Sequence, residues 1–361
     1  MKFVIFGLSV SSSWGNGHAT LWRGLCRALI RRGHEIHFFE RDVPYYAEHR
    51  DMTEIPGGHL HLYPAWEDVS NVARKHLTDA DVGMVTSYCP DALAATGLVL
   101  DSRAACRCFY DLDTGVTLNH LNAGRSVDYL GPRGLQDFDL VLSYVGGKAL
   151  QGLQTRLGAR RVAPLYGSVD PEFHCPVPGL DRYIGDLSYL GTYSDDRQPV
   201  LEALFIEPAR RMPERRFLLG GAMYPKSFPW TSNIHFVRHL PPEEHPAFYS
   251  SSRLTLNVTR PAMAEMGYCP SGRLFEAAAC GVPILSDWFD GLDYFFEPGS
   301  EILIAATTEE AISAIQLSGD ELSTMALRAR QRTLECHTAE IRARELEAVI
   351  MSGRACESVK V

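Results

Sequence analysis

The stretch Tyr268-Cys-Pro-Ser-Gly-Arg-Leu-Phe-Glu-Ala-Ala-Ala-Cys-Gly-Val-Pro-Ile-Leu-Ser-Asp287 decides how the rest of the chain is interpreted. Ser271 is a good N-cap residue, and the run that follows it contains strong helix formers. Gly281 fits the position after a helix end, and the proline two residues later prevents the helix from continuing. Residues 282–286 then have the apolar pattern of a short buried strand. The sequence therefore predicts a short helix followed directly by a strand.

The first turn of this predicted helix has the properties of an anion-binding site. Its free backbone N–H groups and the positive end of the helix dipole favour negative charge at Ser271, Gly272 and Arg273. The Arg273 guanidinium adds a fork that fits phosphate oxygens. Glu276 lies one turn further along the same face, where its carboxylate can accept two hydroxyl hydrogen bonds, as a ribose offers. These features predict a nucleotide site; the alternative is an ordinary capped helix with Arg273 and Glu276 as an i,i+3 surface pair.

The composition is that of an ordinary globular protein long enough for two domains. The chain has 361 residues, of which 45% are hydrophobic and 22% are charged. Its net charge of −9 makes nucleic acid and anionic membrane surfaces poor candidates for partners. Any anionic ligand must therefore be bound by local arginines. No apolar run reaches the length of a membrane span, and no signal peptide is recognisable, so a cytoplasmic location is expected.

Cysteine usage indicates a reducing compartment and predicts no metal site. The cysteines are scattered without paired spacing: Cys26, Cys89, Cys106, Cys108, Cys175, Cys269, Cys280, Cys336 and Cys356. Cys106 and Cys108 do not have the spacing of the common zinc pairs. We therefore expect neither a metal nor a cofactor.

Strand and helix patterns alternate through the N-terminal half. Buried-strand patterns cover residues 2–8, 35–40, 59–63, 82–86, 105–110 and 140–143. Helical patterns lie between them, including 19–32 and 92–100. This alternation predicts a parallel sheet covered on both faces. Similar patterns continue through the C-terminal half and end in a long helix predicted over 321–351.

His18 and two aspartates come after strands whose carboxyl ends share one edge of the predicted sheet. His18 ends the loop 11–18 at the start of a helix, and Asp111 and Asp113 follow the strand 105–110. The loop is not the G-x-G-x-x-G fingerprint, so a dinucleotide site is not expected. The three side chains predict a general base and the carboxylate that orients it. Alternatively, Asp113 and Thr114 cap the following helix, or His18 bonds to its own loop.

The run Pro-Ser-x-Arg-x-Phe-Glu-Ala-Ala-Ala-Cys-Gly at 270–281 resembles the donor-binding helix of the GT-B glycosyltransferases. The likeness is closest to the bacterial group related to spore-maturation protein CgeB, within the family 1 or 4 group. It implies an α/β fold of two facing Rossmann-like doubly wound domains with a central cleft, in which Glu276 holds the nucleotide ribose. Many retaining members carry a second glutamate eight positions earlier, where this chain has Tyr268, so the resemblance favours inversion.

The resemblance also implies which other residues contact the donor. In the family, the loop corresponding to 191–197 approaches the pyrophosphate, and the backbone near 239–240 reads the nucleobase. Acidic residues after the strand 284–286 bind sugar hydroxyls. The candidate donor-binding residues are Tyr193, Arg197, Gly221, His239, Leu240, Arg260, Tyr268, Ser271, Gly272, Arg273 and Glu276, and the candidate sugar-binding residues are Asp287, Asp290 and Gly291. A salt bridge is the alternative role of Arg260, and a solvent-facing turn is the alternative at 239–240.

The acceptor side is assigned to the N-terminal half. Several inverting GT-B enzymes keep a histidine in the first strand-to-helix loop, and plant small-molecule members hold it with an aspartate from later in the chain. By this likeness His18 is the base, and Asp111 or Asp113 is its partner. The remaining acceptor-side candidates are Gly15, Asn16, Gly17, Gly146 and Gly147, although the glycine pair also fits a tight turn that needs positive φ.

We therefore predict a metal-independent hexosyltransferase that moves a sugar from a nucleoside diphosphate sugar (UDP, GDP or dTDP) to a hydroxyl on a small-molecule or glycan acceptor, with inversion. The alternatives are a retaining enzyme with the same donor site, a non-catalytic nucleotide-sugar-binding protein and a GT-B-like epimerase. The predicted organisation is an acceptor domain at 1–165, a linker at 166–183, a donor domain at 184–335 and a final helix at 336–361 that crosses back to the first domain.

Overall fold

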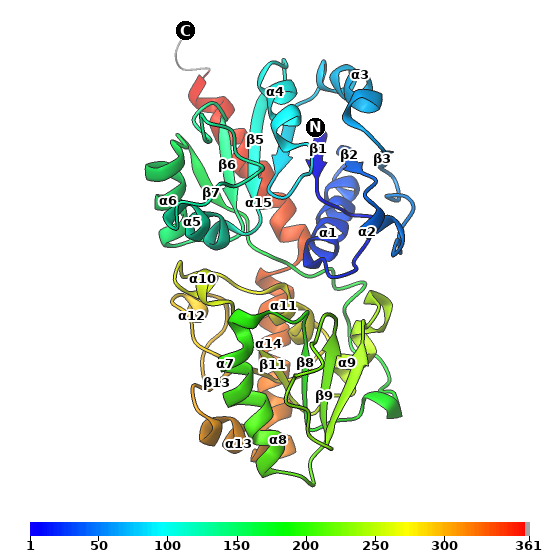
Figure 1. Cartoon of the computed structure of the whole chain (residues 1–361), viewed down its shortest axis with the longest axis vertical. Coiled ribbons are helices and arrows are strands. Elements are labelled where there is room, and N and C mark those ends of the chain that lie inside the picture. The colour runs from blue at the N-terminus through cyan, green and yellow to red at the C-terminus, as the bar shows by residue number, and fades with distance from the viewer. Residues whose placement is uncertain (358–361) are drawn as a thin grey trace. The chain divides into compact units, whose positions relative to one another are not determined.

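The computed structural model describes residues 1–357, and the chain divides into two compact units. The first unit contains residues 1–166 together with the C-terminal segment from 339, and the second contains residues 167–338. The last four residues of the predicted final segment, 358–361, lie outside the described part. Each unit is built on its own parallel sheet, so the chain has the predicted α/β architecture (Figure 1).

The first unit has a sheet of seven parallel strands in the order β3-β2-β1-β4-β5-β6-β7. The strands are β1 (Lys2–Gly7), β2 (Glu35–Arg41), β3 (His59–Tyr63), β4 (Val82–Thr86), β5 (Cys106–Asp111), β6 (Leu140–Ser143) and β7 (Val162–Pro164). The helices of this unit are α1 (Gly17–Arg31), α2 (Pro44–Ala47), α3 (Trp66–Leu77), α4 (Ala92–Leu100), α5 (Thr114–Asn122), α6 (Lys148–Leu157) and α15 (Ala339–Glu357). Strand order reverses beside β1, which places the carboxyl ends of β1 and β4 at a topological switch point.

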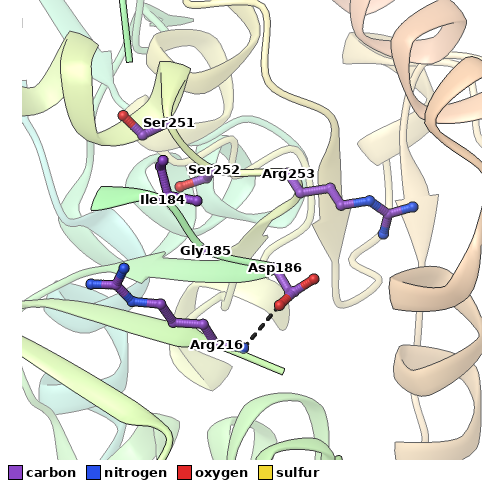
Figure 2. A pocket seen from close by; sticks show the side chains of 7 residues that line it. All are labelled: Ile184, Gly185, Asp186, Arg216, Ser251, Ser252 and Arg253. Atoms are coloured by element: carbon purple, nitrogen blue, oxygen red, sulfur yellow. Dashed lines mark hydrogen bonds between the residues drawn. The ribbon is translucent and has the colours of Figure 1, made fainter. Parts of the chain in front are cut away.

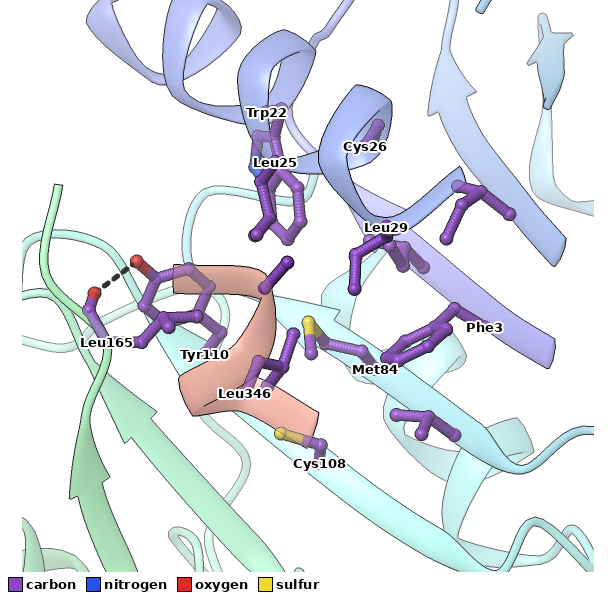
Figure 3. Close-up of a cluster of buried hydrophobic side chains, with 14 of the residues drawn as sticks. Phe3, Trp22, Leu25, Cys26, Leu29, Met84, Cys108, Tyr110, Leu165 and Leu346 are labelled. Carbon is purple, nitrogen blue, oxygen red and sulfur yellow. Dashed lines mark hydrogen bonds between the residues drawn. The ribbon is translucent and has the colours of Figure 1, made fainter. Parts of the chain in front are cut away.

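The final helix completes the core of the first unit. Leu346 of α15 and Trp22 of α1 are both buried in one cluster with Phe3 and Met84 of the sheet (Figure 3). The hydroxyl of Tyr110 donates to the Leu165 carbonyl 2.7 Å away in the same cluster. Apolar side chains from helices α1 and α15 therefore cover one face of the sheet, and a second apolar cluster contains residues of α3, α4 and α6.

The second unit has six parallel strands in the order β10-β9-β8-β11-β12-β13. They are β8 (Leu187–Leu190), β9 (Phe217–Gly221), β10 (Ile234–Arg238), β11 (Thr255–Asn257), β12 (Ile284–Ser286) and β13 (Leu303–Ile304). The helices are α7 (Gln198–Leu201), α8 (Glu207–Arg211), α9 (His245–Ser250), α10 (Pro261–Ala264), α11 (Gly272–Ala279), α12 (Leu292–Phe295), α13 (Thr308–Gln316) and α14 (Gly319–Cys336). A π-helical turn at Glu202–Ile206 joins α7 to α8, and single 3₁₀ turns lie at Asp181–Tyr183, Asp195–Arg197 and Pro242–Glu244.

The prediction of one continuous helix over residues 321–351 is wrong, because two helices cover this part of the chain. The chain leaves the helical path at His337 and Thr338, between α14 and α15. His337 is buried, its Nε2 lies 3.3 Å from the Phe295 carbonyl, and Thr338 forms a parallel bridge with Val169. These contacts with distant parts of the chain replace the helical hydrogen bonds and divide the helical residues between the two units.

Candidate functional site

Helix α11 begins where the sequence predicts an anion site. It runs from Gly272 to Ala279, and the Ser271 side chain accepts a hydrogen bond from the Arg273 N–H over 3.3 Å. The helix leads directly into the parallel strand β12, so its amino end lies at the carboxyl edge of the second sheet. Ligands of doubly wound sheets bind at this edge.

The Arg273 guanidinium is fixed by the carboxyl ends of two strands. Its Nε donates to the Leu190 carbonyl, and its Nη1 donates to Asn257 Oδ1 over 2.9 Å. The guanidinium also lies over the Tyr189 ring, 5.2 Å from the ring centroid. Its remaining nitrogen, Nη2, makes no hydrogen bond with any residue in the described range. One face of the fork is therefore held rigidly while Nη2 stays free to bind an anion.

Glu276 is half-buried and is not paired with Arg273. Within the described residues no group donates a hydrogen bond to its carboxylate, so the predicted alternative of an i,i+3 surface pair is not what forms. Burial raises the pKa of this carboxyl, and the nearby His245 and Arg273 oppose that rise. An unpaired carboxylate in such a position can accept hydrogen bonds from ligand hydroxyls.

Two histidines that sequence reasoning missed lie beside Glu276. His174 is buried and His245 is half-buried at the first position of α9. One ligand atom from each lies within 4.8 Å of a Glu276 carboxylate oxygen. Burial lowers the pKa of both histidines to about 4, so both imidazoles are neutral near pH 7. The sequence offers one indication of this contact. His245 follows the strand 234–238, whose carboxyl end lies at the same edge of the sheet as the amino end of α11.

The carboxyl ends of β8 and β9 approach each other so closely that both need glycine. A Cβ on Gly221 would lie 2.0 Å from the Gly191 carbonyl oxygen, and Gly221 has a φ of +149°. A Cβ on Gly191 would lie 2.9 Å from Arg273 Nη2. The backbone N–H of His239, which has a φ of 46°, donates to the Gly221 carbonyl over 2.7 Å. The predicted residues Gly221, His239 and Arg273 therefore lie close together at the carboxyl ends of β8 and β9, and the buried Leu240 follows His239 in the chain.

The loop between β8 and α7 contains the other predicted donor residues. The Tyr193 hydroxyl donates to Asp195 Oδ1 over 2.7 Å, and its backbone N–H donates to the Ala222 carbonyl. Arg197 Nη2 donates to the Thr192 carbonyl over 2.6 Å, while its buried Nε makes no hydrogen bond with a described residue. Arg260 forms an ion pair with Asp196 at 2.9 Å, which is the alternative role that the sequence left open for it.

The candidate sugar-binding residues differ in how much they are already engaged. Thr259 donates to the Asp287 carboxylate from its backbone N–H and its hydroxyl, so this side chain already fixes the end of β11. Burial raises the pKa of Asp287. Asp290 is exposed, and its carbonyl accepts from the Tyr268 N–H over 2.6 Å. The Tyr268 ring lies so close to Gly291 that a Cβ there would be 2.7 Å away.

In the first unit, a buried carboxylate organises the loop before His18. Glu40 accepts hydrogen bonds from the hydroxyls of Ser9 and Ser11 and from the backbone N–H groups of Val10 and Ser11. The Asn16 amide donates to two loop carbonyls, and its oxygen accepts from the His18 N–H over 3.1 Å. Asn16 is thus the buried N-cap residue of α1, and its side chain stabilises the loop and the helix start. Sequence reasoning had not identified Glu40.

His18 is paired with Asp113 rather than Asp111. His18 Nε2 lies 3.6 Å from Asp113 Oδ2, and both side chains remain partly exposed. Asp113 is the N-cap residue of α5, but its side chain makes no capping hydrogen bond, so its carboxylate is available to the imidazole. The buried His18 Nδ1 has no hydrogen-bond partner among the described residues. This separation of the two atoms is longer than that of a formed hydrogen bond.

Asp111 lies deeper than Asp113 and has a different environment. It is buried, and its Oδ1 accepts from the Asp113 N–H over 3.1 Å. Burial raises the pKa of Asp111 to about 6, opposed by hydrogen bonds from Thr117 and Asp113. Tyr88 lies beside this group, with its ring 6.0 Å from that of His18 and a strained φ of 61°. Such strain at the carboxyl end of β4 is a signature of functional sites that the sequence did not reveal.

The raised pKa of Asp111 predicts a specific pH dependence of stability. The Asp111 carboxyl releases its proton near pH 4 in the unfolded chain and near pH 6 in the folded chain. The free energy of unfolding therefore falls as the pH rises through that range. Asp111→Asn has no such proton. Measured by urea unfolding between pH 4 and 7, the stability of Asp111→Asn relative to wild type should rise by on the order of 1–3 kcal/mol. The exposed Asp101 provides the matched control, Asp101→Asn. A relative stability that stays constant with pH would contradict this assignment.

The glycines predicted for the acceptor side have mainly backbone roles. Gly147 has a φ of 54° and is the N-cap of α6, which is the tight-turn alternative predicted for the pair with Gly146. Gly15 has a φ of 59°, and a Cβ there would lie 3.0 Å from the Tyr45 hydroxyl. Gly17 is the first residue of α1, with open space around its Cβ position.

A small pocket in the second unit lies at the opposite edge of the sheet. It has a volume of about 300 Å³ and is lined by residues that precede β8, β9 and β11, including Asp186, Arg216 and Arg253 (Figure 2). Asp186 accepts from the Arg216 N–H over 2.8 Å, and Arg253 donates to the carbonyls of Ile315 and Leu317. These groups hold the amino edge of the sheet together and are remote from α11's amino end.

Comparison with known proteins agrees with this fold. Residues 197–348 match the family model described as glycosyl transferase-like. Sucrose-phosphate synthase from Thermosynechococcus elongatus superposes with a TM-score of 0.71 at 15% identity, covering 99% of this chain and 100% of that one. The chain has the fold of the GT-B glycosyltransferases. The predicted resemblance and the predicted α/β fold class are therefore confirmed.

Other GT-B structures are similar over the whole chain. Anabaena HepE, in a complex with UDP and glucose, matches with a TM-score of 0.66 at 12% identity and covers 98% of this GT-B chain and 100% of its own. An α-glucosyltransferase in complex with UDP-glucose and DNA containing an abasic site matches with a TM-score of 0.71 at 12% identity, over 97% and 98% of the two chains. No curated protein matches this chain by sequence.

Proposed function

We propose that this GT-B protein transfers a sugar from a nucleoside diphosphate sugar to a hydroxyl group of an acceptor. The observation that carries the proposal is the Glu276 carboxylate, half-buried and without a donor among the described residues, one turn from the free Nη2 of Arg273. Together with the positive end of the α11 dipole, these residues offer a diphosphate site and a ribose site on one helix. Two GT-B relatives of similar fold are described in complexes with UDP or UDP-glucose, so UDP is the first nucleotide to test.

The second unit binds the donor in this proposal. The diphosphate lies at the amino end of α11, where Arg273 and Arg197 neutralise the charge that develops as the sugar leaves. Glu276 accepts the ribose hydroxyls, and neutral His245 beside it supplies a further polar contact. In this proposal the two arginines and the positive end of the α11 dipole neutralise the charge that a metal ion neutralises in other glycosyltransferases.

The first unit binds the acceptor and supplies the base. His18 removes the proton of the acceptor hydroxyl as its oxygen bonds to the anomeric carbon, while the bond from that carbon to the diphosphate breaks and its electron pair leaves with the diphosphate. Asp113 orients the imidazole and stabilises the imidazolium that forms. Tyr268, at the position of the second glutamate of many retaining enzymes, favours this inverting course. The anomeric configuration of the product, measured by NMR, distinguishes it from retention.

The acceptor is proposed to be a small molecule or a glycan. The net charge of −9 disfavours binding of nucleic acid along the surface, although one structural relative was solved with DNA. Among the described residues no helix is both long and apolar enough to cross a bilayer. We propose a cytoplasmic location, in line with the unpaired cysteines.

Nucleotide binding tests the donor site directly. UDP should raise the melting temperature of the wild-type protein, and Glu276→Gln should weaken UDP binding by about 10–150-fold, because hydrogen bonds to a charged acceptor are lost. Isothermal titration with UDP, GDP and dTDP measures the affinities and identifies the base. Glu265→Gln, an exposed glutamate after α10, is the control and should bind as wild type does. If none of the nucleotides bound, or if Glu276→Gln bound UDP with unchanged affinity, the proposal would be wrong.

A further inference from the structure

A group of histidines lies in the first unit on the outermost strands of the sheet, apart from the predicted base. His37 is the third residue of β2, His59 and His61 are on the edge strand β3, and His76 is close to the end of α3. His37 and His59 are paired in the parallel register. The His37 ring stacks 4.5 Å from that of His59 and lies 3.9 Å from that of His76. Desolvation of several imidazole rings costs free energy, so such a cluster indicates that a compensating interaction is present.

Three of these histidines have the arrangement of a metal site. One ligand nitrogen from each of His37, His61 and His76 lies within 4.8 Å of the others. His37 Nδ1 is 3.0 Å from His61 Nε2. Two nitrogens bound to a tetrahedral zinc ion at about 2.0–2.1 Å are about 3.3 Å apart, so this pair needs almost no movement. We propose that His37, His61 and His76 bind a divalent transition-metal ion of the zinc type.

A carboxylate orients the central ligand. Glu35 Oε1 lies 2.6 Å from His37 Nε2. When that nitrogen carries the proton, the Nδ1 lone pair points toward His61, where the ion would lie. A carboxylate that accepts from the far nitrogen of a ligating histidine is the usual support of protein zinc sites. Glu35 is therefore a positioning residue for the proposed ion.

The ion would have a structural role. Strand β3 is at the edge of the sheet and pairs only with β2 among the described strands, and α3 returns the chain from β3 to β4. An ion held by His37, His61 and His76 would join these three elements at one point. His61 and His76 are half-buried, so a water molecule can complete four-coordination. The expectation of no metal site was based on the spacing of the cysteines alone.

Metal analysis of the full chain tests this proposal. Protein stripped with EDTA and titrated with Zn²⁺ should bind one ion that His61→Gln and His76→Gln lose, and bound zinc should raise the melting temperature only when both histidines are present. Glu35→Gln should weaken zinc binding by about 10–100-fold. The exposed His235→Gln, in β10, is the matched control and should bind zinc as wild type does.

A second group, His174 with His245 and Glu276, provides the competing location. Zinc binding that is lost in His174→Gln but kept in His61→Gln would overturn the proposal, as would the absence of zinc binding at micromolar concentration. Because His61 and His76 are partly exposed, circular dichroism of each variant separates lost ligation from misfolding. With Co²⁺ as the probe, intense visible bands of a four-coordinate ion should appear in wild type and be missing in both variants.

Discussion

Replacement of His18 by alanine is expected to lower kcat for sugar transfer by about 10²–10⁴ while leaving the affinity for UDP unchanged. His18 and its partner Asp113 belong to the first unit, whereas the residues proposed to contact the nucleotide belong to the second. Loss of the imidazole therefore removes the proton acceptor without touching the donor site. The rate is measured with saturating donor and acceptor, and UDP affinity by titration calorimetry.

Two further variants sharpen this experiment. Asp113→Asn keeps the imidazole but removes the carboxylate 3.6 Å from it, so kcat should fall by less than in His18→Ala. His120→Ala, in the last turn of α5, removes another histidine of the same unit and should have wild-type turnover. Transfer at the wild-type rate in His18→Ala would show that the base is elsewhere or that the reaction proceeds with retention.

The Arg273→Ala variant is expected to lower kcat by about 10²–10³, comparable to the loss of one oxyanion donor. Without the Arg273 guanidinium, the departing diphosphate would lose one hydrogen-bond donor that neutralises its developing charge. Removal of this side chain also leaves the Leu190 carbonyl and the buried Asn257 oxygen without a donor, so some loss of stability accompanies the loss of rate. The melting temperature must therefore be measured alongside the rate.

Arg273→Lys separates the two effects. A lysine restores the charge but not the fork, so it should recover only part of the rate. Arg211→Ala removes an exposed arginine that pairs with Glu309 in the same unit, and it should leave turnover unchanged. If Arg273→Ala, still folded at the assay temperature, turned over as fast as wild type, α11 would not be the diphosphate site.

Local patterns were enough to predict the helix and the strand that carry the proposed donor site. Capping and breaking residues placed α11 within one residue of its observed end, because these signals act over a single turn. They could not decide between a surface pair and a binding site at Arg273 and Glu276. That choice depends on the Leu190 carbonyl and Asn257, which are distant in sequence and meet Arg273 only in the folded sheet.

The same limit explains what the sequence left open or missed. The sequence does not distinguish Asp111 from Asp113. In the folded chain, the start of α5 places Asp111 in the core and leaves Asp113 near His18. His174 reaches Glu276 from a segment predicted as a linker, and no local signal indicates such a contact. The break at His337 depends on Val169 and Phe295 and is likewise invisible to helical periodicity.

The position of α15 has a consequence for biosynthesis. Ala343, Leu346 and Ile350 are buried in the core of the first unit although they are made after the whole of the second unit. A nascent chain that has emerged only as far as residue 166 lacks this helix, so an apolar strip over the first sheet stays open to water. The second unit is contiguous and can fold during translation, whereas the first is completed only after α15 has been made.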